Sequence, residues 1–143
     1  MNTLHSIVRG RPLYFIEQNW TVLEAARYMA EKKIGAAAVV EGDYCVGVFS
    51  ERDLMTRVVV AGRMAAQTLV SEVMTREVVA CAPEESYEEG LRQMQQAKCR
   101  HLPIVEEGRL LGFVSLRDLM QIEIEEKDEE LRHINAYVNS TGY

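Results

Sequence analysis

The chain has 143 residues, 48% of them hydrophobic and 27% charged, which suits a globular protein with one core or two small halves that share one. Its net charge of −6 argues against general nucleic-acid binding, which usually depends on a basic surface. No apolar run approaches the roughly 20 residues of a membrane helix, and the start lacks the apolar core of a signal peptide, so we expect a cytoplasmic protein.

The three cysteines are Cys45, Cys81 and Cys99, an odd number without a C-x-x-C pair. Each lies in an apolar run, which favours buried, reduced thiols. Cys99 and His101 have the spacing of half a zinc site, but no second pair of ligands stands at zinc spacing, so we expect no metal. A mixed disulfide with a redox partner is the weaker alternative for these thiols.

The first half of the chain predicts the element order β-α-β-β-α. Thr21 and Glu24 form a capping-box pattern that begins a helix with apolar residues at helical spacing. A second helix begins at Ser50 and stops before Gly62. The three predicted strands cover residues 13–16, 36–40 and 45–49.

A connection over residues 61–77 contains a short helical turn at 69–74 and is too apolar for a flexible linker. The second half then repeats the element order, with a capping-box pattern at Ser86 and Glu89 and a second helix that begins at Ser115. Its predicted strands cover residues 78–81, 102–105 and 110–114.

After Met120 the last helix continues through a run of acidic residues. This run is either an acidic partner surface or a solvated face held by Glu123–Lys127 and Asp128–Arg132 pairs, and we favour the solvated face. An apolar stripe further along predicts packing on another surface, such as a second subunit. The stripe consists of Leu131, Ile134, Tyr137 and Val138.

The two halves are copies of one another. At an offset of 65 residues, which aligns Thr21 with Ser86, twelve of 35 positions are identical. Such a match indicates a tandem duplication. One unit alone would leave a face of its sheet uncovered, so we expect the two copies to pack together.

Each copy carries the motif Gly-x-x-Ser-x-Arg-Asp-Leu-Met where a strand meets a helix, at residues 47–55 and 112–120. The first N–H groups of a helix favour an anion, whereas the aspartate accepts hydrogen bonds from hydroxyls. A ribonucleotide satisfies both, with ribose hydroxyls on the aspartate and phosphate on the serine, arginine and amides. The same pattern also caps a helix without any ligand, and each arginine has nearby carboxylates as alternative partners, so both alternatives stay open here.

Other residues could complete such a site. Gly35 and the alanines after it expose backbone groups at a strand edge, where an adenine ring fits. Arg100 and His101 place cationic donors before a buried strand, and Arg9 and Arg11 could add two more. An acidic protein that collects arginines at these points suggests an anion-binding cleft.

The duplicated motif, together with Arg100–Val105 before its second copy, resembles the cystathionine-β-synthase (CBS) domain. The tandem pair resembles a Bateman module of the stand-alone type found in bacteria and plant organelles, and the ending 134–137 with a final Tyr143 is similar to those proteins. The resemblance implies an α/β fold of two β-α-β-β-α halves related by a pseudo-twofold axis, with a C-terminal helical extension. We expect the domains to cover 8–60 and 78–126, with a connection over 61–77 and a helical tail over 127–143.

The family resemblance also implies a regulatory function. Two clefts between the halves would bind an adenosyl ligand such as AMP, ADP, ATP, NAD(H) or S-adenosylmethionine and report energy or redox state to a partner protein. A homodimer is implied, without membrane or nucleic-acid partners. The alternative is a constitutive dimeric scaffold with non-functional clefts. We expect no enzyme, because no nucleophile–base pair, Walker loop or metal cluster is recognisable.

The resemblance assigns residues to each cleft. In one, Asp118 would hold the ribose beside Ser115 and Arg117. The adenine and phosphate contacts of this cleft would be Tyr14, Ile34, Gly35, Ala36, Arg100 and His101. The mirror cleft would consist of Ser50, Arg52, Asp53, Val79, Cys99, Arg100 and His101. Because Gly35 and Ala36 stand where the second copy has Arg100 and His101, we expect the Asp118 cleft to bind better.

Overall fold

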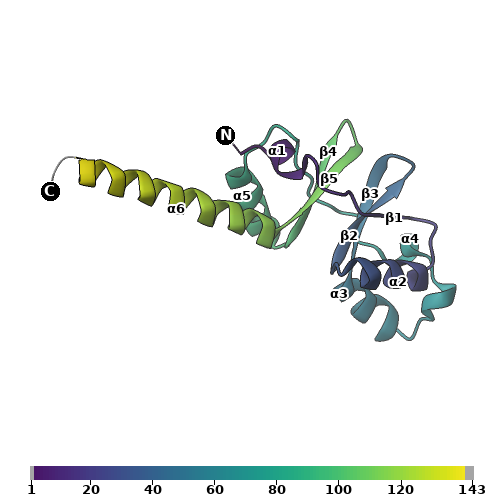
Figure 1. Ribbon diagram of the computed structural model, residues 1–143. Helices are drawn as coiled ribbons and strands as arrows, with labels where there is room; N and C mark the ends of the chain where they lie inside the picture. Colours follow the sequence, from purple (N-terminus) through teal and green to yellow (C-terminus); the bar gives the residue numbers. More distant parts are fainter. Residues whose placement is uncertain (1, 141–143) are drawn as a thin grey trace.

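A computed structural model describes residues 2–140 and shows two α/β halves side by side, with a long helix projecting from the second (Figure 1). The predicted ending at 141–143 lies outside the described residues. The elements of the first half and the connection are α1 (Leu4–Val8), β1 (Phe15–Glu17), α2 (Val22–Lys32), β2 (Ala36–Glu41), β3 (Tyr44–Ser50), α3 (Glu51–Asp53), η1 (Leu54–Val59), η2 (Ala65–Gln67) and α4 (Val70–Val73). The second half contains α5 (Tyr87–Ala97), β4 (His101–Glu106), β5 (Arg109–Ser115) and α6 (Leu116–Ser140).

The strands form one sheet in the order β1-β2-β3-β5-β4. β2 with β3, and β4 with β5, form antiparallel hairpins, whereas β1 pairs in parallel with β2. The hairpins are joined at their tips, where Tyr44 pairs with Arg109 and the N–H of Leu110 donates to the Asp43 carbonyl at 2.9 Å. The fold is therefore the expected α/β arrangement of two similar halves.

The 65-residue offset also relates the pairing of the two halves. Ile16 pairs in parallel with Val39, and Cys81 pairs in parallel with Ile104. The predicted strand over 78–81 is nevertheless wrong, because this segment forms an isolated bridge at Cys81. The predicted strand over 13–16 is shifted to Phe15–Glu17. The residues before β1 are not part of the sheet, because there the chain crosses from α1 to the first half (Figure 1).

Each half has its own apolar core, and each core is completed by a segment from outside the repeat. The first contains Val70, Val73 and Met74 from the connection. The second contains Leu4 from α1, which is fully buried, and the N–H of Leu4 donates to the Glu85 carbonyl at 2.8 Å. The beginning of the chain therefore packs on the second half, which ties the two halves together.

The capping predictions hold fully for the first helix and partly for its copy. At the start of α2, the Thr21 hydroxyl accepts from the Glu24 N–H and the Glu24 carboxylate accepts from the Thr21 N–H. At the start of α5, Ser86 accepts from the N–H of Glu89, but the Glu89 carboxylate accepts from Arg92 instead. The competing guanidinium explains why the second box is incomplete.

The helices that follow the duplicated motif differ between the halves. The first contains a single α-helical turn and then continues as the π-helix η1, which ends before Gly62 at φ +74°. The second is the 25-residue α6. Tyr87 and Asn2 both donate to the Glu126 carboxylate at 2.7 Å, so α6 contacts the body of the protein up to this point.

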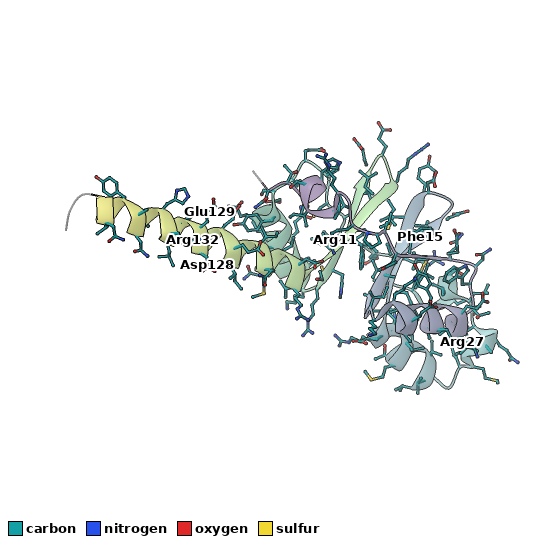
Figure 2. All side chains as sticks on the ribbon, in the orientation of Figure 1. Arg11, Phe15, Arg27, Asp128, Glu129 and Arg132 are labelled. Carbon is teal, nitrogen blue, oxygen red and sulfur yellow. The ribbon has the colours of Figure 1, made fainter. Side chains whose placement is uncertain are left out.

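Beyond Glu126 the helix projects into solvent, and the predicted stripe at Leu131 and Ile134 is 57% exposed at both residues. Among the described residues, the predicted pairs Glu123–Lys127 and Asp128–Arg132 do not approach within 4 Å, and the pair on this helix joins His133 to Glu129 at 3.8 Å. Figure 2 labels Asp128, Glu129 and Arg132 on this projecting part of α6, where exposed charges gain little from a fixed pairing. No helix within residues 2–140 is long and apolar enough to cross a membrane.

Candidate functional site

A cavity of about 1020 Å³ opens where the two halves meet the N-terminal segment, which is the part of the chain before β1, residues 2–14. Figure 2 shows Arg11 in this central region. Residues 11–14 and 33–36 contribute from the first part of the chain, and residues 100–101, 111–113 and the first turns of α6 contribute from the second half. Both copies of the repeat therefore contribute walls to one cavity.

Asp118 lies on this cavity in the first turn of α6. Its Oδ2 accepts from the Ser115 N–H at 2.9 Å, and its own N–H donates to the Ser115 Oγ at 3.0 Å. The same Oδ2 accepts from Nη2 of Arg11 at 3.1 Å. The capping motif thus fixes the carboxylate, and the N-terminal segment supplies a cation to it.

Three influences act on the pKa of Asp118. Partial burial raises this pKa. The Ser115 N–H and the Arg11 guanidinium together lower it by more than burial raises it, so the pKa lies below its ordinary value of 3.8. The carboxylate is consequently ionised at neutral pH. An ionised carboxylate accepts hydrogen bonds only, so Asp118 can bind groups that donate, such as N–H or O–H groups.

The walls of the cavity carry more positive than negative charge, although the whole chain is acidic. Four cationic side chains and two carboxylates line it. They are Arg11, Lys33, Arg100 and Arg117, with Glu51 and Asp118. This local excess of cations makes the cavity suitable for an anionic ligand.

His101 lies in the same wall and stacks on Phe113, with ring centroids 5.4 Å apart. Burial lowers its pKa, Asp118 and Glu51 act in the opposite direction, and the net shift is downward. His101 is therefore mainly neutral at pH 7. It can give or accept one hydrogen bond there without adding a full charge.

Small residues form the opposite wall, at the start of β2. A Cβ atom at Gly35 would lie 3.2 Å from Oε1 of Glu51, so a side chain here would crowd that carboxylate. The Gly35 carbonyl already accepts from the N–H of Glu51 at 2.9 Å. The expectation of free backbone groups at this edge is therefore wrong for this carbonyl, because the start of α3 uses it.

All nine residues assigned to the Asp118 cleft line this one cavity, and their roles toward a ligand stay a prediction. They are Tyr14, Ile34, Gly35, Ala36, Arg100, His101, Ser115, Arg117 and Asp118. The sequence interpretation missed Lys33 and Glu51. Lys33 immediately precedes the predicted adenine wall in the sequence, which is the signal that could have found it. In the structure it is the C-cap of α2, at φ 58°.

The structure places the mirror residues differently. Asp53 is only 8% exposed, and its carboxylate accepts from the Ser50 N–H at 3.0 Å and from the Thr75 hydroxyl at 3.3 Å. Nε of Arg57 lies 3.7 Å from the same carboxylate. Ser50, Arg52, Asp53, Val79 and Cys99 do not line the cavity described above.

Segments outside the repeat produce this difference. At the 65-residue offset, Thr75 corresponds to Gly10 and Arg76 to Arg11. Thr75 is held by two backbone hydrogen bonds with Val48, at 2.9 and 3.0 Å, which place its hydroxyl on Asp53. The connection therefore contacts Asp53 through the neutral hydroxyl of Thr75, whereas the N-terminal segment contacts Asp118 through the charged side chain of Arg11.

No disulfide joins the three cysteines, which all lie in the described part of the chain. Burial raises the pKa of Cys81 to about 12, with nearby carboxylates as further causes. Burial also raises the pKa of Cys45 and of Cys99. The three thiols are therefore mostly protonated at neutral pH, which makes them weak nucleophiles.

The model of the CBS domain family matches residues 7–60 and 70–125. The CBS domain-containing protein CBSX3, mitochondrial, from Arabidopsis thaliana is 31% identical over 128 residues, which are 86% of this chain and 62% of that protein. The structure of a putative signal-transduction protein with CBS domains from Burkholderia ambifaria has 36% identity and a TM-score of 0.78 over 87% of this chain and 95% of that one.

A second structure is similar in fold alone. It is the CBS domain pair of protein MJ0100 in complex with 5-methylthioadenosine and S-adenosyl-L-methionine, with a TM-score of 0.76 and 20% identity over 88% of this chain and 98% of that one. The two family-model matches together cover most of the chain. The chain therefore belongs to the CBS domain family and carries two copies of the domain in tandem.

Proposed function

We propose that this protein is a regulatory module that binds one adenosyl nucleotide in the cavity beside Asp118. The observation that carries the proposal is an ionised carboxylate, fixed by Ser115, on the wall of a cavity with an excess of cations. The chemistry of a ribonucleotide matches this combination, because its hydroxyls donate to a carboxylate and its phosphate accepts from guanidinium and ammonium groups.

Each wall has a role in this proposal. Asp118 accepts from the ribose hydroxyls, and the adenine ring lies against Ile34, Ala36 and Tyr14. Arg100 and Arg117 meet the phosphate. Binding rather than catalysis is proposed, since a CBS pair is a binding module and its ligand acts here as a signal.

The charge of the cavity supports a phosphorylated ligand. AMP, ADP, ATP and NAD(H) carry negative charge, whereas the sulfonium of S-adenosylmethionine adds a positive charge to a wall already rich in cations. The MJ0100 pair holds S-adenosylmethionine, so the fold accepts it. For this chain we propose the nucleotides as the preferred ligands.

A ligand in this cavity contacts both halves and the N-terminal segment at once. It therefore changes the relative stability of their packing arrangements, and a partner protein reads the difference. We propose a cytoplasmic homodimer as the functional unit. Exposed apolar residues on η1 and α6, such as Met55, Val59 and Ile124, supply a surface for a second copy.

Calorimetric titration with AMP, ATP, NADH and S-adenosylmethionine tests the proposal. We expect the three nucleotides to bind more tightly than S-adenosylmethionine. Native mass spectrometry of freshly purified protein is the complementary measurement, because a retained nucleotide reports its own identity and stoichiometry. Absence of binding by all four compounds at millimolar concentration would contradict the proposed function and favour the scaffold alternative.

A further inference from the structure

Arg11 occupies one of the two carboxylate oxygens of Asp118, the acceptor proposed for the ribose. Its Nη2 lies 3.1 Å from Oδ2 of Asp118, the same oxygen that accepts from the Ser115 N–H. The pair joins residues 107 positions apart, and the two side chains are 42% and 32% exposed. Oδ2 therefore already has two donors, so a ribose hydroxyl that takes this oxygen must displace Arg11.

Displacement of Arg11 leaves a guanidinium that needs another anion. The remaining carboxylate of the cavity, Glu51, projects from the opposite half and lies over Gly35. A phosphate on the incoming ligand would supply an acceptor inside the same cavity. Adenosine would displace Arg11 without offering it a partner, whereas a 5′-phosphorylated nucleoside would provide one.

The backbone around Arg11 is fixed, so the exchange requires a change of its side chain only. The N–H of Arg11 donates to the Val8 carbonyl at 3.1 Å, which closes a turn at Gly10 with φ +79°. Val8 itself packs against Gly112, where a Cβ atom would lie 2.8 Å from its side chain. The segment is thus anchored to the second half while the guanidinium remains accessible.

We propose that Arg11 exchanges partners when ligand binds, leaving Asp118 to the ribose and pairing with the phosphate. This adds Arg11 to Arg100 and Arg117 as a residue through which the site selects phosphorylated adenosine over adenosine. The inference rests on the proposed function, because it assigns the ribose to Asp118. It goes beyond that function because it states that the ligand displaces the Arg11 guanidinium from Asp118 and that the same guanidinium then pairs with the phosphate.

The chain supplies a matched control in Arg76, which occupies the corresponding position of the other half. Nη2 of Arg76 donates to the Ser71 carbonyl at 2.7 Å, and Arg76 does not line the cavity. Its removal takes the same charge from the protein without touching the exchange. A difference between the two arginine variants therefore reports on position rather than on net charge.

Calorimetric titration of AMP and adenosine into the wild type, Arg11→Ala, Arg11→Gln and Arg76→Ala tests the exchange. Loss of a half-exposed ion pair should strengthen adenosine binding to both Arg11 variants by about two- to fivefold. Loss of a charged contact to phosphate should weaken AMP binding by about tenfold. Arg76→Ala should change neither affinity, and circular dichroism checks that each variant is folded.

The outcomes separate the two levels of the proposal. If the wild type binds AMP, and the Arg11 variants shift AMP and adenosine in the same direction or not at all, the exchange is refuted and the proposed function stands. If the wild type binds neither AMP nor adenosine, the exchange is refuted, and the titrations with ATP, NADH and S-adenosylmethionine decide the proposed function. An NMR titration adds a readout that needs no ligand, since Arg11→Ala should raise the pKa of Asp118 in the free protein.

Discussion

The two aspartates of the repeat begin from the same motif and finish in opposite situations. Asp118 lies on a large cavity and is reached by an exposed arginine, whereas Asp53 is buried under Thr75 and Arg57. The backbone of the motif is alike in both, with a serine that accepts from the aspartate N–H at 3.0 or 3.2 Å. The comparison teaches that the connection and the N-terminal segment, and not the motif, decide whether the aspartate of each copy lies on a cavity.

One further position strengthens the contrast. Arg57 contacts Asp53 and also donates to the Met74 carbonyl at 3.0 Å, which links η1 to the connection. The residue at the same offset in the second half is Ile122, which packs against the second apolar core. An isoleucine cannot pair with a carboxylate, so Asp118 depends on the N-terminal segment for its cation.

Exchange of each aspartate for alanine should give the largest difference between the halves. We expect Asp118→Ala to weaken AMP binding by at least about tenfold, because a charged acceptor for ribose is lost. Asp53→Ala should leave AMP affinity unchanged but lower the free energy of unfolding by about 2 kcal/mol, since Ser50, Thr75 and Arg57 lose their shared acceptor. Calorimetry and urea unfolding of both variants measure the two effects. Equal loss of AMP affinity in both would show that the Asp53 side also binds.

The paired glycines sharpen the comparison at intermediate size. A Cβ atom at Gly47 would lie 2.8 Å from the Met74 sulfur and from the Thr75 carbonyl oxygen, and one at Gly112 would lie 2.8 Å from Val8. We expect each alanine variant to lose about 1–3 kcal/mol of stability through overpacking. Only Gly112→Ala should also weaken AMP binding, because Val8 anchors the turn that carries Arg11. Chemical unfolding and calorimetry decide this, and an AMP defect in Gly47→Ala would argue against two independent sides.

The smallest expected effect is the pH dependence of the Asp118 contacts. The pKa of Asp118 is lower in the folded protein than its ordinary value of 3.8, so its contacts stabilise the fold above that value. The contribution is lost as pH falls through the lower, folded pKa. Asp118→Asn should therefore be less stable than the wild type at pH 7, and the difference should shrink below pH 3.8 in urea unfolding. A difference that stays constant between these pH values would contradict the assignment.

Much of the local structure was predictable because local patterns control it. The capping box at Thr21 and Glu24 forms as expected, and the apolar runs become the buried strands β2 and β4. The predicted strand over 78–81 failed because a strand needs hydrogen-bonding neighbours, and only Cys81 meets one. The incomplete box at Glu89 failed for a similar reason, since Arg92 competes for the carboxylate.

The candidate site shows the same division. The residues of the Asp118 cleft could be named from the family resemblance, and they line one cavity because most of them stand in or beside the repeated elements that meet there. The exposure of the residues assigned to the mirror cleft could not be predicted from local patterns. Whether Asp53 faces solvent depends on Thr75, which lies in a connection whose path no local pattern specifies.

The amino-acid order alone determined that the chain is a duplicated unit of helices and strands and that each unit ends in a helix opened by a serine and an aspartate. These features depend on short-range hydrogen bonds and on the spacing of apolar side chains along one element. Only the tertiary structure decided that α1 covers the second half, that the connection closes over Asp53 and that Arg11 reaches Asp118. Those outcomes depend on contacts between residues far apart in the chain, whose relative positions exist only after both halves have packed.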